Sequence, residues 1–286
     1  MNQKNNDDFV LAAVTVAGSA ESSGKSSALR LDRMNLTVSP GEWITIVGVN
    51  GSGKTTLARI MAGLTVEEAG GYMNRGFAGD RPAPYVMQQP DAQLFGETPR
   101  EEITFALEWL QLPAADIPVK TDAILMLSGL QSIAYFPWAN LSGGQRQLAA
   151  IAAATAGNAP LIVFDEATSM LDDRSRERVY HIAKELNAAG SSVVWVTQRL
   201  DELESSSRVI ALAEGRIIFD GSSEHFLYGE PTPSLPSAMS SSTPCEQCGL
   251  RLPYLASLAM ELKRLGQLQS PLPITVEEWR RALNVG

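Results

Sequence analysis

One short glycine-rich segment constrains this sequence more than any other: residues 48–55 read GVNGSGKT. The segment fits G-x-x-x-x-G-K-[ST] at every position, and it lies between the apolar run Trp43–Val47 and a helical pattern that begins near Thr55. Glycines let such a loop curl until its backbone amides point inward, and the following helix adds the positive end of its dipole. The sequence therefore predicts a strand, a phosphate-binding loop and a helix in that order.

The residue types in this loop suit the polyphosphate of a nucleoside triphosphate. We expect Lys54 to reach the β- and γ-phosphates, and Thr55 to offer a hydroxyl to Mg²⁺, which prefers oxygen ligands. A second run, residues 18–26, also ends in Gly-Lys-Ser, but its spacing is one residue too long and it lacks the strand–helix frame, so it is predicted to be a loop. The predicted nucleotide-binding residues are Gly48, Asn50, Gly51, Ser52, Gly53, Lys54, Thr55 and Thr56.

A second motif delivers two adjacent carboxylates. The apolar run Leu161–Phe164 predicts a buried strand, and Asp165 and Glu166 follow at its carboxyl end, where open α/β sheets place their ligands. We expect Asp165 to hold the Mg²⁺ shell and Glu166 to polarise an attacking water toward the γ-phosphate. Alone, the pair also fits a strand that exits into solvent; the phosphate-binding loop favours the catalytic interpretation.

Apolar runs alternate with helical patterns up to about residue 228, which predicts an α/β domain with a mostly parallel sheet. Further strands are expected at Val193–Thr197 and Val209–Leu212. Residues 9–46, by contrast, look antiparallel, with a Gly/Ser-rich loop at 18–27.

The last quarter of the chain differs in composition. Residues 231–244 are rich in Pro and Ser and are expected to form a linker, because proline cannot continue a helix or a central strand. Beyond them, Tyr254–Leu265 has helical spacing, and Thr275 suits the N-cap of a last short helix.

Charge and cysteine content exclude several classes of protein. With 23 basic and 32 acidic side chains the net charge is -9, so no cationic face for nucleic acid is expected. No apolar run approaches the length of a membrane span. Cys245 and Cys248 are the only cysteines, which excludes a disulfide scaffold. One C-x-x-C pair supplies half of a zinc site, so neither a metal nor a redox function is predicted, although a site shared across a dimer stays open.

A third motif, LSGGQ at residues 141–145, decides the family. Ser142 suits an N-cap, and the two glycines after it expose the amides of a helix that runs to about Ala156, a second receptor for phosphate. Taken alone, the motif is also compatible with a simple helix cap. Placed upstream of the carboxylate strand, it resembles the signature motif of ATP-binding cassette proteins. That resemblance implies contact with the γ-phosphate bound by a partner subunit, through Ser142, Gly143, Gly144 and Gln145.

Two further segments fit the same family. Gln88 resembles the glutamine that links the ion and water site to the helical subdomain, and Ser169–Asp172 resembles the loop that crosses the dimer. The resemblance covers roughly residues 9–228 and implies Mg-ATP as the cofactor. It assigns catalysis to Glu166, Gln198 and Gln88, and Mg²⁺ binding to Thr55, Gln88 and Asp165.

The fold that the resemblance implies is an α/β P-loop NTPase cassette: a RecA-like core with antiparallel β and helical subdomains, plus a small helical C-terminal domain. The expected boundaries are residues 1–228 for the ATP-binding domain, with the helical subdomain at about 90–150, 229–244 for the linker and 245–286 for a dimerisation segment.

A narrower resemblance follows from residues 89–95, QPDAQLF, and from ITVEE at 274–278 after a leucine-rich helix. Both look like the ATP-binding subunits of energy-coupling factor transporters, the cobalt-type and vitamin-type importers. This implies a peripheral ATPase on the cytoplasmic face of the cell membrane. Its partners would be a second cassette subunit, an integral membrane scaffold and a substrate-binding membrane component, and its task would be uptake of a micronutrient.

Two positions depart from the family pattern. Gln198 stands where the family places a histidine that contacts the γ-phosphate, and glutamine cannot carry a proton or a charge there. His181 and His225 lie in helical patterns elsewhere. The aromatic side chain expected to stack on adenine near residues 16–18 is also missing. We hypothesise that this chain's own site hydrolyses ATP slowly and that a heterodimer is favoured over a homodimer; the alternative is that glutamine or water substitutes adequately.

Two other functions remain possible at this stage. A soluble cassette ATPase of translation or DNA repair is disfavoured, because such proteins usually carry two cassettes, a long coiled-coil insertion or basic arms. A non-hydrolysing regulatory subunit would bind ATP only to stabilise a complex. Replacement of Glu166 by glutamine distinguishes this last possibility.

Overall fold

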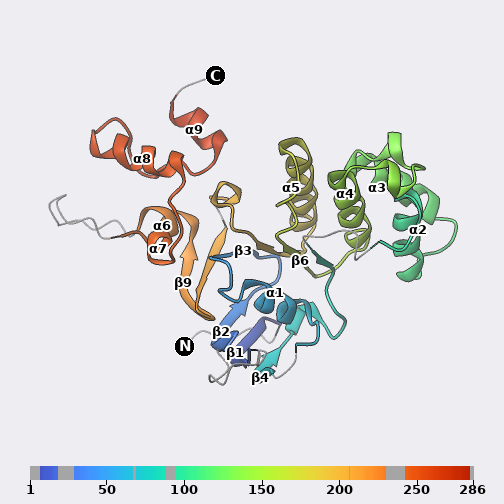
Figure 1. Cartoon of the computed structure of the whole chain (residues 1–286), viewed down its shortest axis with the longest axis horizontal. Coiled ribbons are helices and arrows are strands. Elements are labelled where there is room, and N and C mark those ends of the chain that lie inside the picture. The colour runs from blue at the N-terminus through green and yellow to red at the C-terminus, as the bar shows by residue number, and fades with distance from the viewer. Residues whose placement is uncertain are drawn as a thin grey trace.

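The computed structural model describes residues 7–18, 29–66, 69–87, 94–205, 207–229 and 242–283, which form two sheets and the helices around them (Figure 1). The central six-stranded sheet has the order β5-β6-β7-β3-β8-β9, and the smaller antiparallel sheet has the order β2-β1-β4. The strands are β1 (Phe9–Val16), β2 (Leu31–Val38), β3 (Trp43–Gly48), β4 (Ala69–Asn74), β5 (Tyr85–Val86), β6 (Leu161–Asp165), β7 (Ser192–Val196), β8 (Arg208–Ala213) and β9 (Arg216–Ser222).

Strands β3, β6, β7 and β8 of the central sheet are buried on both faces. Its strands from β5 to β8 pair in parallel, and only β9 is antiparallel. Along β6, Leu161 and Val163 pack into one apolar cluster, while Ile162 and Phe164 pack into another on the opposite face. Because side chains alternate along a strand, covering both faces requires the continuous apolar runs found in the sequence.

Helix α1 (Lys54–Ala62) lies between the two sheets (Figure 1). Leu57 and Met61 of this helix are fully buried in the same cluster as Phe9 of β1 and Ile46 of β3. The helix that follows the glycine-rich loop is therefore held from both sides, and this fixes the loop at its N-terminus.

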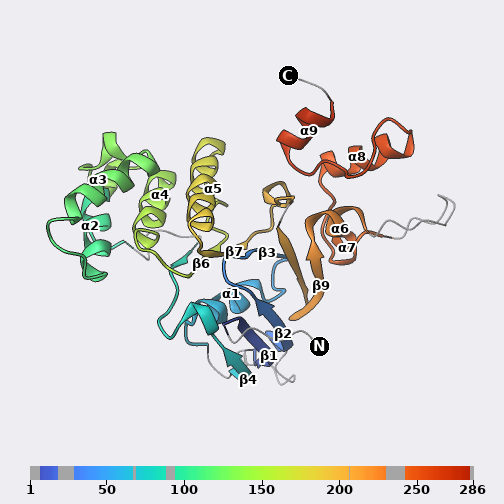
Figure 2. The same cartoon turned by 180° about the vertical axis from the view of Figure 1, so that it is seen from behind.

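The opposite face of the central sheet carries α5 (Asp173–Ala188), and beyond it lies a group of three helices (Figure 2). These are α2 (Pro99–Trp109), α3 (Ile117–Ser128) and α4 (Gly143–Ala154). Short 3-10 turns complete the connections, at η1 (Gly76–Ala78), η3 (Gln131–Ile133), η4 (Trp138–Asn140) and η5 (Leu200–Glu202).

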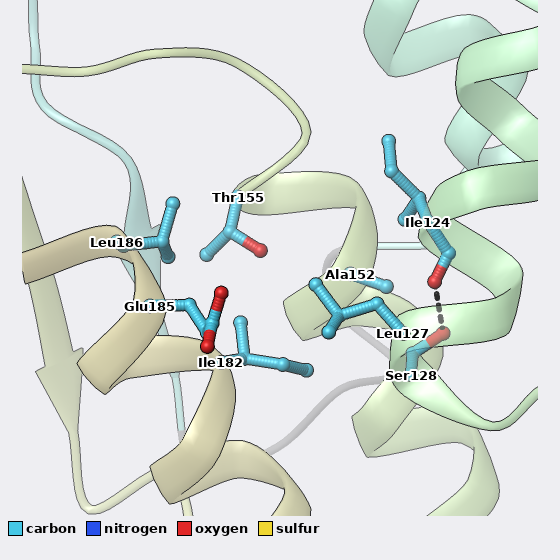
Figure 3. A pocket seen from close by; sticks show the side chains of 8 residues that line it. All are labelled: Ile124, Leu127, Ser128, Ala152, Thr155, Ile182, Glu185 and Leu186. Carbon is cyan, nitrogen blue, oxygen red and sulfur yellow. Dashed lines mark hydrogen bonds between the residues drawn. The ribbon is translucent and has the colours of Figure 1, made fainter. Parts of the chain in front are cut away.

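A cavity of about 130 Å³ lies between α3, α4 and α5 (Figure 3). Most of the side chains around it are apolar, and the hydroxyl of Ser128 donates to the carbonyl of Ile124 at 2.7 Å. The wall consists of Ile124, Leu127, Ser128, Ala152, Thr155, Ile182, Glu185 and Leu186.

Helix α6 (Ser223–Tyr228) packs against β8 and β9, and α7 (Pro244–Gln247) packs against α6 (Figure 1). Beyond them lie α8 (Tyr254–Arg264) and α9 (Val276–Ala282), whose apolar side chains pack against Tyr228. Cys245 and Cys248 are 0% and 3% exposed and share a core with Val47 and Phe226. The Thr275 side chain caps α9 in a reciprocal capping box with Glu278. Within the described ranges, no helix combines the length and the apolarity that crossing a bilayer requires.

The structure confirms the predicted α/β fold with a mostly parallel sheet. The four strands predicted in the core domain occur within one residue of their expected bounds. Most of the loop at 18–27 and of the linker lies outside the described residues. At the end of the predicted linker, Thr243 caps α7, and Pro244 occupies the first helical position. Proline is favoured at that position because the missing amide has no partner there anyway.

Candidate active site

The loop between β3 and α1 curls in a way that requires glycine. Gly51 and Gly53 have φ values of 80° and 102°, in the left-handed region that side chains disfavour. A Cβ atom on Gly53 would lie 2.7 Å from the carbonyl oxygen of Arg30. Gly53 is also the N-cap of α1 and supplies no side-chain acceptor to its first amides, so these amides remain suited to an anion.

A cavity of about 330 Å³ opens at this loop. Of the predicted nucleotide-binding residues, Gly48 and Ser52 do not line it. Ser52 is 2% exposed, and its hydroxyl has no hydrogen-bond partner in the described part of the chain. Arg30 was not identified from the sequence, since nothing in its local pattern marks it; it reaches the cavity from the start of β2. The lining residues are Arg30, Asn50, Gly51, Gly53, Lys54, Thr55, Thr56 and Glu166.

Lys54 is 5% exposed and lies over the loop. Its ammonium group donates to the carbonyl oxygens of Gly48 at 2.9 Å and Val49 at 3.1 Å, and it lies 3.9 Å from Oε1 of Glu166. Burial lowers the pKa of Lys54, and the nearby carboxylates of Glu166 and Asp165 oppose that shift. A phosphate group in the cavity would give this buried cation the anionic partner that offsets its desolvation.

Asp165 is held by two hydroxyl groups. Thr55 donates to Oδ1 at 3.4 Å, and Tyr85 donates to Oδ2 at 2.5 Å. Burial raises the pKa of Asp165, and the hydrogen bonds from Tyr85 and Thr55 oppose the shift. The neighbouring hydroxyl and carboxylate oxygens are the donor types that Mg²⁺ prefers, so this pair fits the ion. Tyr85 was not identified from the sequence, because its partner lies 80 residues further along.

Glu166 and Gln198 meet at the ends of β6 and β7. Glu166 has a φ of 50°, and its amide donates to the carbonyl of Val196 at 3.0 Å. The side-chain amide of Gln198 donates to Oε1 of Glu166 at 2.5 Å. A neutral donor therefore faces the carboxylate at the position where the family pattern has a histidine.

The LSGGQ motif begins α4, away from this cavity. Ser142 and Gln145 form a capping box, with Gln145 N donating to Ser142 Oγ at 3.2 Å and Ser142 N to Gln145 Oε1 at 2.9 Å. Ser142 and Gly143 are exposed, and Gly144 and Gln145 are partly exposed. In the part of the chain that the structure describes, none of these four residues lines the phosphate-loop cavity. The motif is therefore available to a second molecule.

The remaining candidates lie elsewhere. Gln88 falls outside the described residues, so its role stays a prediction. Burial raises the pKa of Cys245 to about 12 and that of Cys248 to about 11, which keeps both thiols protonated. His181 lies on α5, 3.8 Å from Glu185, and His225 lies in α6. Among the described residues, no group of three or more His, Cys, Asp or Glu side chains could hold a metal ion.

This loop, carboxylate pair and parallel sheet define a nucleotide-binding protein of the P-loop class. The ABC transporter family profile matches residues 31–169. Because relatives at 34% identity match over most of their length, the chain belongs to the ATP-binding cassette family and, within it, to the ATP-binding proteins of energy-coupling factor transporters.

The relatives that carry this assignment match over most of their length. Energy-coupling factor transporter ATP-binding protein EcfA1 of Lactiplantibacillus plantarum is 34% identical over 87% of this chain and 88% of its own. EcfA of Methanosarcina acetivorans is 34% identical over 82% and 85%. Among solved structures, the dimeric ATP-binding cassette MJ0796 bound to ADP and Pi aligns with a TM-score of 0.63 and 26% identity, over 75% of this chain and 98% of that one.

Replacement of Asp165 by asparagine is expected to raise the free energy of unfolding of the nucleotide-free protein at about pH 7. The folded-state pKa of Asp165 exceeds its ordinary value of 3.8 because the carboxyl group is buried. The ionised carboxylate therefore destabilises the folded protein at neutral pH. This destabilisation disappears as the pH falls through the folded-state pKa and then through the unfolded-state pKa. Denaturant unfolding of wild type and variant between about pH 7 and pH 4 should therefore give a difference that shrinks toward acid.

Asp172→Asn is the matched control. The pKa of Asp172 is lowered by its hydrogen bond from the Ser175 amide at the start of α5, and asparagine caps helices equally well. This variant should show no gain in stability at any pH. Lower stability of Asp165→Asn at every pH would contradict the assigned cost of the buried charge.

Proposed function

We propose that this chain is the ATP-hydrolysing subunit of an energy-coupling factor type importer, and that it couples binding and hydrolysis of Mg-ATP to uptake of a micronutrient, a vitamin or a metal ion. The observation that carries the proposal is that Lys54, Thr55 and Glu166 line one cavity, with Asp165 hydrogen-bonded to Thr55 beside it. The LSGGQ motif, in contrast, is exposed in another part of the chain. The first arrangement suits ATP hydrolysis, and the second suits a paired assembly.

Each residue of the site has a separate role in the proposed reaction. Lys54 exchanges the carbonyls of Gly48 and Val49 for phosphate oxygens and neutralises their charge. Glu166 accepts a proton from the attacking water, and Gln198 orients that carboxylate. Thr55, Asp165 and Gln88 would hold Mg²⁺, which when bound neutralises the charge on the transferred phosphoryl group.

A second cassette subunit is required because one chain holds only half of each nucleotide site. The signature residues of one subunit would complete the cavity of the other, and the related cassette MJ0796 was solved as a dimer. Gln198 and the missing adenine aromatic favour a heterodimer over a homodimer. We assign dimerisation support to residues 245–286, where Tyr254 of α8 is 81% exposed.

The membrane partners would dock on the helical subdomain, which we place at about residues 90–150 within the ATP-binding domain, residues 1–228. Phe95, Trp109 and Tyr135 are 86%, 89% and 71% exposed there. Large exposed aromatic side chains are typical anchors of protein interfaces. We propose that an integral membrane scaffold binds here, connected to a substrate-binding membrane component, and holds the chain at the cytoplasmic face of the membrane.

Replacement of Glu166 by glutamine tests hydrolysis. ATP turnover should fall at least about 100-fold, because the water loses its proton acceptor, while ATP binding remains. The measurement is phosphate release with and without partner subunits, beside ATP affinity in a filter-binding assay. Glu261→Gln on exposed α8 should match wild type. Equal, negligible turnover in wild type and Glu166→Gln would instead favour a non-hydrolysing regulatory subunit.

Replacement of Gln198 by histidine should raise ATP turnover at this chain's own site at least about tenfold, because histidine can carry a proton near the γ-phosphate. Gln198→Asn, which keeps the amide and shortens the reach, should give no gain. Steady-state phosphate release over a range of ATP concentrations provides the comparison. No gain with histidine would mean that the glutamine, or a water, already serves the site.

Replacement of both Phe95 and Trp109 by serine should weaken association with membranes roughly 10-fold to 100-fold without loss of ATP binding, since large aromatic side chains dominate interface energies. The measurement is the share of the chain that copurifies with membranes when it is expressed with its partner subunits. Tyr72→Ser, at a 60% exposed site on β4, is the control. An equal loss of membrane association in Tyr72→Ser would contradict docking on the helical subdomain.

A further inference from the structure

Glu202, at the end of η5, has a nearly buried carboxylate with both oxygens occupied. Its side chain is 10% exposed. The hydroxyl of Thr168 donates to Oε1 at 2.7 Å, and the indole nitrogen of Trp195 donates to Oε2 at 2.9 Å. Nε of Arg199 lies 3.7 Å from Oε1. A carboxylate removed from water in this way is tolerated only when its partners are held in place.

The partners of Glu202 are fixed by the core. Trp195 is 1% exposed, and its ring packs against Trp43, Phe164 and Tyr180 with centroid separations of 5.7, 5.1 and 5.4 Å. Thr168 is 3% exposed. The carboxylate therefore joins a rigid aromatic cluster to the turn that follows Glu166.

These contacts continue the pairing of β6 and β7 beyond the end of the sheet. The last paired residues are Asp165 and Val196. Past them, the amide of Glu166 donates to Val196 O, Gln198 donates to Glu166, and then Thr168 donates to Glu202. The Glu166–Gln198 hydrogen bond thus lies between a backbone link on one side and the Glu202 link on the other.

We propose that Glu202 is a positioning residue that holds Gln198 against Glu166 and connects this pair to the adjoining loop, Ser169–Asp172. The inference rests on the ATP hydrolysis proposed above and deepens it. The loop after Thr168 is the segment predicted to reach the partner subunit. Through its hydrogen bond from Thr168, Glu202 therefore connects the region around Glu166 with the proposed subunit interface. Thr168 and Glu202 were not identified from the sequence, because 34 residues separate them.

The test replaces Glu202 by glutamine, which keeps the shape and removes one of the two acceptor oxygens. ATP turnover should fall about tenfold with KM for ATP unchanged, because one hydrogen bond that holds the segments on either side of the pair is lost. The matched control is Glu204→Gln, two residues further along, whose carboxylate pairs with Lys184 at 2.8 Å; its turnover should stay within about twofold of wild type. Should Glu202→Gln fail to fold, Thr168→Val removes the same link from the other side.

A double-mutant cycle distinguishes positioning from general structural support. In a Gln198→Ala background, Glu202→Gln should change turnover by less than about twofold, because the pair that it positions is already broken. The same tenfold loss in both backgrounds would overturn the proposal.

Amide hydrogen exchange decides the proposal if the wild-type protein hydrolyses no ATP, an outcome that would refute the proposed function alone. Exchange over residues 166–172 and 198–203 should be faster in Glu202→Gln than in Glu204→Gln. Equal exchange in the two variants would overturn the positioning role.

Discussion

The structure depends on placing one buried ammonium group beside two carboxylates at the end of a parallel sheet. Lys54 is 5% exposed and Asp165 is 7% exposed, although burial disfavours the charged form of each. Strands β3 and β6, covered on both faces, deliver the two groups to the same edge. Burying these charges away from water lowers the stability of the protein. The same burial strengthens the interaction of the charges with a polyphosphate in the cavity.

The separation of motifs within one chain supports the paired assembly proposed above. The glycine-rich loop and Glu166 share a cavity, whereas the LSGGQ residues begin α4 with their own capping box and are exposed or partly exposed. The contact between Gln198 and Glu166 makes the two motifs of this chain unequal. The chain has a neutral donor beside its own Glu166, and it carries an intact signature motif that would serve the site of a partner. A departure from the family pattern at one site and an intact motif for another site thus occur in the same polypeptide.

Local features were predictable from the sequence, and long-range contacts were not. The loop at residues 48–55 and the buried strand before Asp165 follow from glycine spacing and from continuous apolar runs. Tyr85, Thr168 and Glu202 escaped detection because each acts on a group far along the chain, so its identity alone carries no signal. The start of α7 was not predicted because the preceding residues are rich in Pro and Ser and indicate a linker, although Thr243 and Glu246 form a capping box there. The role of Gln88 and the action of Ser142–Gln145 on a partner's nucleotide remain predictions.

The cavity between α3, α4 and α5 has a mechanical consequence (Figure 3). The cavity takes the place of side-chain packing between these helices, so sliding α3 and α4 past α5 breaks fewer side-chain contacts than it would in a fully packed interface. The backbone hydrogen bonds inside each helix are unaffected by such a slide. We therefore expect α3 and α4 to shift against α5 as a rigid group rather than to deform internally.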